Sequence, residues 1–491
     1  MRNLRLLVIT GVALALLFTS GLSAAAGDLD PTFDGDGKAV TDFGVDDVAK
    51  GVAAQGDGKI VAAGYTRDPA KGSDFAVARY NRDGSLDSGF GDGGKVRTDF
   101  GGTDDRGSAV AVQPDGKIVV AGWALVPDVT FYTDIALARY NPDGSLDSTF
   151  GSGGKLLTNL ERTDFANGLA IQPDGKIVVV GGERSAPSGH DYAFAAVRYN
   201  PEGSLDPTFG GSGHVITPFT EGLDLAEGVI VQPDGKIVAA GVADASSPDT
   251  QDLALARYNP DGSLDAGFDF DGKVQTRDPA SAGAWNVARQ ADGKLVVAGG
   301  IVARYNPNGS LDSTFGSAGK VVLGESTSAR VVLVEPDSEL VVAGTYFNPD
   351  EFVVAKLKEN GSRDQSFGDD GQVRTDIGFN SYDDVYAAVL QSDGRIVVDG
   401  ATQASFTGPP ADFALARYLN PAPCKVPNVR GRKLAVAKTR IRKAHCAVGI
   451  ITRMRSKPAK KGRVLSQRPK AGVTVPSGAE VSLVVGKGRG R

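Results

Sequence analysis

The stretch Gln113–Gly122, QPDGKIVVAG, decides the fold, because versions of it recur seven times in this chain of 491 residues. Successive copies start 58, 59, 60, 58, 45 and 56 residues apart, and a steady period without a helical pattern inside it indicates one repeated β unit. The copies begin at Gln55, Gln113, Gln172, Gln232, Gln290, Glu335 and Gln391.

Each repeat holds four short β-rich runs. In the second repeat these are GKVRTDF from Gly94, SAVAVQ from Ser108, KIVVAG from Lys117 and IALARY from Ile135. Three of them alternate like half-buried strands, whereas KIVVAG is a continuous apolar run that is typical of a strand covered on both faces. The PDG and NPDGS segments between runs favour tight hairpins. The sequence therefore predicts an all-β fold, a seven-bladed β-propeller, with an open solenoid as the alternative.

The two ends of the repeat array complement each other. The last repeat stops at Tyr418 and lacks the LDxTFG motif and the GKV strand that follow ARY elsewhere. Both occur near the N-terminus, as LDPTF from Leu29 and GKAV from Gly37. We therefore expect the N-terminal strand to close the last blade, which removes two exposed sheet edges.

The repeats resemble those of the bacterial delta-60 repeat family in their LDxTFG, QPDGKIVVAG and FALARYNPDGSLD segments. The resemblance covers nearly all of residues 29–418 and implies a propeller-like exported protein with no known reaction. The fifth repeat departs from the pattern because Gly300 runs almost directly into Ala303. The sixth departs by charge, with Glu335, Ser338, Glu339 and Lys356.

Targeting and charge divide the chain further. Arg2, Arg5, an apolar run from Leu6 to Phe18 and the small residues up to Ala26 predict a signal peptide over 1–26, and hence export. No later segment is apolar over a length that spans a membrane. Residues 424–491 carry 19 Lys or Arg and one acid, whereas residues 27–423 carry 32 basic and 58 acidic residues. We therefore expect a propeller over 27–419, a linker over 420–423 and a basic domain over 424–491.

The basic domain has a mixed pattern, with a helical spacing from Leu434 to Ala444 followed by three strand-like runs. It resembles a PASTA domain in VPNVRG from Val426, GRVLSQRPKAG from Gly462 and VPSGAEVSLVVGKG from Val475. The resemblance implies a small α+β domain that is associated with peptidoglycan and so directs the protein to the cell wall. Charge independently favours anionic wall polymers. There are two alternatives. The domain is a solvated module that contributes only to stability, or it docks on the acidic propeller.

Both cysteines, Cys424 and Cys446, lie in this basic domain. An exported protein matures where disulfides persist, so we expect the two to be paired. They depart from the usual PASTA pattern, and a bridge between them is suited to clip the first strand to the end of the helix.

Propeller loops alternate between two faces, and the irregular loops share the face opposite the uniform PDG and NPDGS turns. Function concentrates in such variable loops, so we expect a protein or glycan to bind there. The alternatives are that the aromatic residues cover blade edges and that the acids form Asx turns. The candidate residues are Asp46, Asp47, Asp104, Asp105, Trp123, Phe131, Tyr132, Asp164, Asp224, Tyr346, Phe347, Asp383 and Asp384.

Signals for chemistry are weak. Asp34 and Asp36 resemble the start of a calcium loop, but Ser or Ala replaces these acids in other repeats, so a turn is the better interpretation. His190, His214 and His445 lack metal-ligand spacing. We therefore expect no metal, cofactor or catalytic residue, and the sequence favours a non-catalytic protein over an enzyme.

The resulting hypothesis is an exported bacterial scaffold or binding protein, either secreted or associated with the cell wall. Its propeller binds a protein or glycan, and its tail at 424–491 associates with peptidoglycan or an anionic wall polymer. Nucleic acid is not an expected partner. The alternative function is a propeller-based hydrolase or lyase that acts on wall or extracellular polysaccharide. A structural envelope protein without a small ligand is a third hypothesis.

Overall fold

The computed structural model describes residues 25–126, 132–160, 163–184, 192–244, 251–277, 283–324, 326–347, 349–378, 381–403, 411–420, 424–444, 446–475 and 480–488. Some residues named in the sequence analysis lie outside these ranges, namely 1–24 of the expected signal peptide, 421–423 of the linker, Phe131, His190 and His445. Within the described residues, no helix has the length and apolar character needed to cross a membrane.

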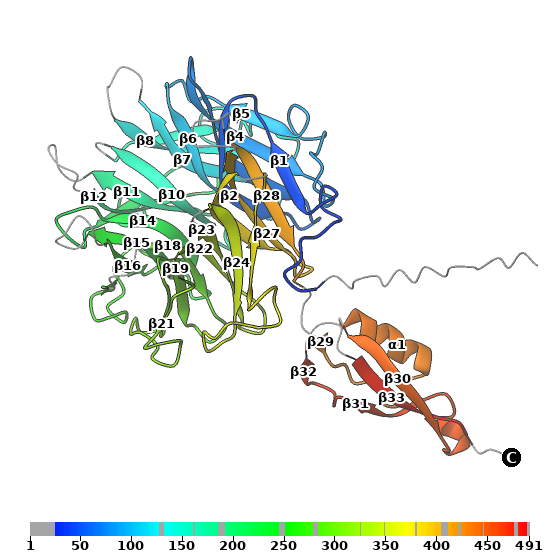
Figure 1. Cartoon of the computed structure of the whole chain (residues 1–491). Helices are drawn as coiled ribbons and strands as arrows, with labels where there is room; N and C mark the ends of the chain where they lie inside the picture. The colour runs from blue at the N-terminus through cyan, green and yellow to red at the C-terminus, as the bar shows by residue number, and fades with distance from the viewer. Residues whose placement is uncertain are drawn as a thin grey trace, which may run out of the picture.

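The described repeats form seven four-stranded antiparallel sheets, which follow one another around a common centre as the blades of a propeller (Figure 1). The predicted seven-bladed propeller is therefore confirmed. Inner strands of neighbouring blades contact one another at the centre. These inner strands are β2 (Asp46–Ala54), β6 (Asp105–Val112), β10 (Asp164–Ile171), β14 (Leu225–Val231), β18 (Ala284–Arg289), β22 (Thr327–Val334) and β26 (Tyr382–Leu390).

The second and third strands of each blade are the KIVVAG and ALARY runs. The second strands are β3 (Ile60–Asp68), β7 (Ile118–Leu125), β11 (Ile177–Arg184), β15 (Ile237–Asp244), β19 (Leu295–Gly299), β23 (Leu340–Tyr346) and β27 (Ile396–Gln403). The third strands are β4 (Gly72–Tyr80), β8 (Thr133–Tyr140), β12 (Tyr192–Tyr199), β16 (Gln251–Tyr258), β20 (Val302–Tyr305), β24 (Glu351–Leu357) and β28 (Asp412–Tyr418).

The outer strands are short. Those of the first six blades are β5 (Lys95–Thr98), β9 (Lys155–Thr158), β13 (His214–Thr217), β17 (Lys273–Thr276), β21 (Lys320–Val321) and β25 (Gln372–Thr375). In the seventh blade the N-terminal strand β1 (Lys38–Thr41) takes this place and pairs antiparallel with β28, from Lys38 opposite Ala416 to Thr41 opposite Phe413. The last sheet thus joins residues from the two ends of the propeller.

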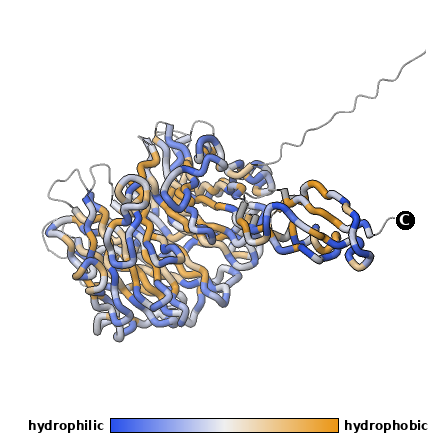
Figure 2. Tube along the Cα trace, turned by 90° about the horizontal axis from the view of Figure 1, so that it is seen from below, coloured by the Kyte–Doolittle hydropathy of each residue, from blue (hydrophilic) through white to orange (hydrophobic). Residues whose placement is uncertain are grey.

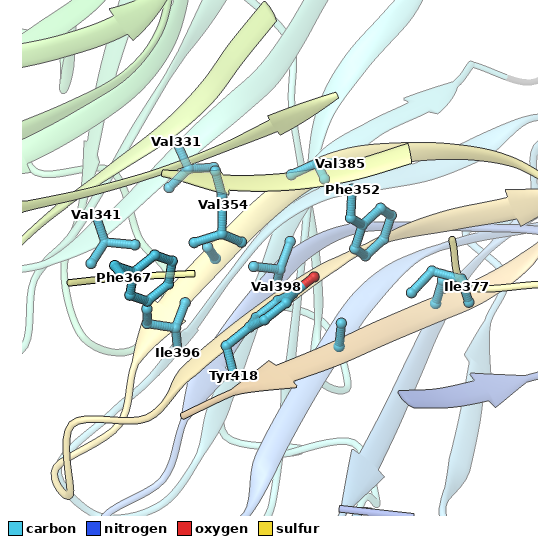
Figure 3. Packing of buried hydrophobic residues seen from close by; sticks show 14 residues of the cluster. Val331, Val341, Phe352, Val354, Phe367, Ile377, Val385, Ile396, Val398 and Tyr418 are labelled. Carbon is cyan, nitrogen blue, oxygen red and sulfur yellow. The ribbon is translucent and has the colours of Figure 1, made fainter. Parts of the chain in front are cut away.

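Hydrophobic side chains fill the space between neighbouring blades. Between the sixth and seventh blades, Val331, Val341 and Val354 lie in one cluster with Ile396 and Val398 (Figure 3). Hydrophobic segments follow the strands, whereas the connecting turns are hydrophilic (Figure 2). Because burying a Val or Ile side chain contributes about 1.5–3 kcal/mol, these clusters supply most of the stabilisation between blades.

Each ARY motif also ties its blade to both neighbours by polar contacts. In the second blade, Arg139 Nε donates a hydrogen bond to Asp147 Oδ2 at 2.7 Å, and its Nη1 donates to the carbonyl of Pro201 in the third blade. The hydroxyl of Tyr140 lies 2.8 Å from that of Thr98 in the first blade. The buried Arg–Asp pair recurs as Arg79–Asp87, Arg198–Asp206, Arg257–Asp265, Arg304–Asp312 and Arg417–Asp30.

The sixth blade replaces this arginine by Lys356 and compensates for the change. Its ammonium group lies 2.7 Å from Glu335 and 3.1 Å from Glu339, at positions where the other repeats carry Gln and a Lys or Arg. Lys356 also donates to the side chain of Asn420 at 3.3 Å, and Asn420 donates to Glu335 at 2.5 Å. The charged residues that distinguish this repeat therefore form one buried network with Asn420, and this network holds the end of the propeller.

The C-terminal domain has its own core and mixed secondary structure. Val429, Ala437, Ile441 and Val481 are completely buried in one cluster. Cys446 is 4% exposed in the same cluster, whereas the side chain of Cys424 lies outside the described part, so their pairing stays a prediction. The elements are β29 (Cys424–Lys425), α1 (Leu434–Lys443), β30 (Ala447–Met454), the short 3-10 helix η1 (Pro458–Lys460), β31 (Val464–Arg468), β32 (Thr474–Val475) and β33 (Glu480–Gly486).

Removing Asp30 tests the link between the two ends of the propeller. Arg417 is 2% exposed and its guanidinium group lies 2.8 Å from Asp30, so Asp30→Ala leaves a buried charge without this partner. We expect a loss of about 3–5 kcal/mol in the free energy of unfolding, measured by urea denaturation. The control Asp36→Ala removes an exposed carboxylate six residues further along the chain, and should cost under about 1 kcal/mol. Equal losses in the two variants would contradict this role of the pair.

Candidate functional site

Every inner strand carries a β-bulge at the same place. In β2, Ala49 pairs with Gly64 and Gly51 pairs with Ala63, so that Lys50 is an extra residue without a partner on β3. A bulge of this kind redirects a side chain out of the regular alternation of the strand. The extra residues of the seven blades, in order, are Lys50, Ser108, Asn167, Glu227, Trp285, Arg330 and Tyr386.

All seven bulge residues line one cavity of about 470 Å³ where the inner strands meet. This volume lies within the range of small-molecule sites, roughly 300–1,000 Å³. The position is equivalent in the seven repeats, yet it carries seven different side chains, while the turns and second strands around it are nearly uniform. The repeated fold does not require this diversity, so we regard the cavity as the candidate binding site.

The last glycine of each QPDGKIVVAG copy makes room for the bulge. A Cβ atom on Gly64 would lie 1.9 Å from the backbone carbonyl oxygen of Val48, far inside contact distance. The equivalent glycines of the other six blades meet the inner-strand carbonyl at 1.7–2.0 Å. The glycine therefore permits the close approach of the inner strand, and through it the placement of the bulge residue.

Two cations in the cavity rest on aromatic rings. The ammonium group of Lys50 lies 3.3 Å from the ring centre of Tyr386, and the guanidinium group of Arg330 lies 4.3 Å from that of Trp285. Stacking of this kind holds a cation without neutralising its charge. Among the described residues, neither cation forms an ion pair within 4.0 Å, and Arg330 Nε and Trp285 Nε1 are buried without a hydrogen-bond partner.

A third cation, Arg106, lies beside the bulge of the second blade. Its guanidinium group is 4.9 Å from the ring centre of Tyr65 and 5.2 Å from that of Trp123, and it forms two hydrogen bonds of 2.9 Å with Asp104. Tyr65 pairs with Val48, and Trp123 pairs with Arg106, on the side of the bulge where the inner strands begin. These side chains therefore extend the cavity towards the face that carries the irregular loops.

Glu227 is the one carboxylate among the described residues that line the cavity. Burial raises the pKa of Glu227 to about 8, although the charges of Arg330 and Lys50 oppose this shift. Burial also lowers the pKa of Lys50 to about 8, and the neighbouring charge of Arg330 lowers it further. At neutral pH the cavity is therefore positively charged, because Glu227 is mostly protonated there while Lys50 and Arg330 remain charged.

The structure places the predicted loop-face residues in different roles. Trp123 lines the cavity. Asp46 accepts a hydrogen bond from the backbone N–H of Ala411, and Asp384 lies near Lys50 and opposes the lowering of its pKa. Five other acids are completely buried, and each accepts a backbone N–H from the preceding connection at 2.5–2.7 Å; they are Asp47, Asp105, Asp164, Asp224 and Asp383.

The five buried acids thus hold the connections between blades by accepting N–H groups from four to six residues before them, and their part in binding stays a prediction. Of the remaining aromatic candidates, Tyr132 is 39% exposed and Phe347 is 41% exposed, while Tyr346 lies under the guanidinium group of Arg374 at 3.4 Å. Their part in binding stays a prediction.

The sequence analysis missed all seven bulge residues and the repeat position that they share. Each bulge residue stands five positions before the first residue of a QPDGKIVVAG copy, as Lys50 does before Gln55 and Tyr386 before Gln391. Aligning the repeats on that string would have shown that this position of the inner strand carries a different residue in every repeat.

Among the residues that the structure describes, three acidic groups have carboxylate oxygens close enough to share a cation, namely Asp42 with Asp47 and Asp412, Asp74 with Asp99 and Asp105, and Glu335 with Asp337 and Glu339. Burial raises the pKa of Asp105 to about 6 and that of Asp412 to about 6. Lys356 already forms ion pairs with Glu335 and Glu339 of the third group. Exposed acidic groups of this kind are common without an ion, and they do not contribute to the cavity.

Comparison with known proteins agrees with this architecture. The PASTA domain matches at residues 425–487, and the β-propeller domain of unknown function DUF5122 matches at 55–90, 113–150, 172–209, 232–268, 290–315, 335–367 and 391–420. The protein is thus a repeat propeller with a C-terminal PASTA domain. It belongs to the DUF5122 β-propeller family, and the resemblance to delta-60 repeats agrees with this assignment.

Solved structures with similar folds share little sequence with the chain. The polysaccharide lyase Uly1 is 13% identical over 76% of this chain and 90% of its own, with a TM-score of 0.42. YCF48 bound to a D1 peptide is 12% identical over 82% and 99%, with a TM-score of 0.41. A protein of unknown function from Dyadobacter fermentans is 15% identical over 63% and 93%, with a TM-score of 0.39. No curated protein matches the chain.

The role of the repeated glycine can be tested in the first blade. Gly64→Ala would drive a methyl group into the carbonyl of Val48, so we expect a loss of about 3 kcal/mol in the free energy of unfolding. Gly56→Ala is the matched control, because a Cβ there meets no atom within 4 Å. Urea denaturation compares the two variants. A Gly64→Ala protein as stable as the control would show that the strands do not need this close approach.

The raised pKa of Glu227 predicts a pH-dependent stability. The unfolded chain releases the proton near the ordinary pKa of 4.5, whereas the folded protein retains it up to about 8. The contribution of Glu227 to the free energy of unfolding is therefore fully present below pH 4.5 and decreases as the pH rises towards 8. Between pH 5 and pH 8, we expect the melting temperature of Glu227→Gln to exceed that of the parent protein by an increasing margin, as measured by thermal unfolding. A constant difference in melting temperature across this range would contradict the raised pKa.

Proposed function

We propose that this protein is a non-catalytic, extracytoplasmic binding protein of the cell wall. In this proposal the central cavity of the propeller binds a glycan from the face with the irregular loops, and the PASTA domain associates with peptidoglycan or anionic wall polymers. The observation that carries the proposal is the set of seven unlike side chains that converge on one cavity from a single repeated position.

The lining of the cavity suits a glycan. Trp123, Trp285 and Tyr65 offer aromatic surface, while Ser108 and Asn167 offer groups that hydrogen-bond to hydroxyls. Sites for small ligands combine these two kinds of surface. The alternative of a wall hydrolase requires an acid and a second carboxylate as base or nucleophile, and the described lining supplies Glu227 alone.

The charge of the C-terminal domain supports its proposed association with the cell wall. PASTA domains in general bind peptidoglycan or peptides. Basic side chains at the end of β30 and around η1 are exposed, among them Arg453, Arg455, Lys457 and Lys460. Because these charges lie in water, their attraction to an anionic polymer should be strong at low salt and weak at high salt.

Sedimentation with purified peptidoglycan tests the proposed association of the protein with the cell wall. We expect the full chain to sediment at about 10 mM ionic strength and to stay in solution at about 1 M, where the Debye length falls from about 30 Å to about 3 Å. A chain that ends at Asn420 is the control, since it retains the contacts of Asn420 with Glu335 and Lys356.

Peptidoglycan with and without its attached anionic polymers distinguishes the two wall ligands. Retention that is equal for the full and the shortened chain would contradict binding through the C-terminal domain. Release of soluble sugars from the polymer during the assay, lost in Glu227→Gln, would favour the hydrolase or lyase instead.

A further inference from the structure

The charged and neutral groups of the cavity lie on different sides of the ring of blades. Arg330, Lys50 and Arg106 come from the sixth, first and second blades, with Tyr386 of the seventh blade between the first two. The third and fourth blades contribute Asn167 and Glu227 on the other side. A ligand in the cavity thus meets cations along one edge and neutral hydrogen-bonding groups along the other.

The cations are available to a ligand. Lys50 and Arg330 are held by aromatic rings rather than by carboxylates, so their N–H groups are not consumed by ion pairs among the described residues. Leaving two like charges half-buried and close together is costly without an anion between them. An anionic group that binds there removes this cost and gains charge-assisted hydrogen bonds.

The cavity is much larger than a simple anion. Its volume of about 470 Å³ exceeds that of an acetate or phosphate ion several times, and the surface beyond the cations is aromatic, amide and hydroxyl. Such a surface suits a ring with hydroxyl groups. The two requirements meet in a sugar that also carries a carboxylate.

On the basis of the proposed glycan-binding function, we propose that the central cavity selects a carboxylate-bearing sugar, with Lys50 and Arg330 holding the carboxylate. Arg106 is a weaker contributor because Asp104 already binds it. Asn167 and Glu227 face the sugar hydroxyls from the third and fourth blades, and Ser108 does so from the second blade.

The chain has a built-in reporter for this test, since it contains two tryptophans and both, Trp123 and Trp285, line the cavity. The full chain is titrated at neutral pH and constant ionic strength while tryptophan fluorescence is recorded. N-acetylmuramic acid is compared with N-acetylglucosamine, and glucuronate with glucose, because each pair differs in its carboxylate. Acetate and inorganic phosphate are the anions without a sugar.

We expect a saturable change with the acidic sugars at concentrations at least about tenfold below those that the neutral sugars require. Lys50→Met and Arg330→Met should each remove most of this preference, so that acidic and neutral sugars bind with nearly equal affinity. Lys50→Arg should retain the preference. Arg374→Met is the matched control, because Arg374 also stacks on a tyrosine, Tyr346, but outside the cavity.

The outcomes separate the inference from the function on which it rests. Equal affinity for acidic and neutral sugars overturns the inference and leaves glycan binding in place. Acetate or phosphate that competes as well as the acidic sugars overturns the sugar part of the inference. A preference that persists in both methionine variants overturns the assignment of Lys50 and Arg330. No response to any sugar overturns both proposals for the cavity, while the sedimentation assay decides the wall address independently.

Discussion

The buried pair between the arginine of ARY and the aspartate of LDxTFG is the interaction on which the ring depends. It fixes the end of each third strand, and the same arginine then reaches a carbonyl of the next blade, as Arg198 does with Pro260. Hydrophobic contacts between blades are strong but not directional, whereas this pair sets how one sheet meets the next. Where the pair is lost in the sixth repeat, Lys356 and Glu335 rebuild it with different residues.

Scaffold and site are separated within each repeat. The turns, the second strand and the ARY link are constrained by packing against neighbours on both sides, so they vary little. The bulge residue contacts the cavity instead, and its replacement costs the scaffold little. Lys50, Glu227 and Trp285 can therefore differ completely at one structural position. A propeller of this kind builds a binding site from seven side chains that can vary independently, without changing the arrangement of its blades.

Much of the fold could be predicted from the sequence, because period, hairpin residues and apolar runs are local signals. The four runs of a repeat correspond to strands, and the short fifth repeat still forms β18 to β21. The site could not be predicted in the same way. Simple alternation does not reveal a bulge, so the direction of Lys50 or Arg330 follows only from the pairing of β2 and β22 with their neighbours. Trp123 was predicted because it follows VVAG, and it lines the cavity from β7, whereas acids such as Asp164 are buried near the start of the inner strands.

The pairing of β1 with β28 has a consequence for how the protein is made. The first strand of the propeller to be synthesised must wait for nearly the last, since its partner lies more than 350 residues later in the chain. Until β28 is made, β1 has no partner strand and the ring cannot close. A chain that lacks the final repeat therefore stays open, and the native protein forms in a late step that this repeat makes available.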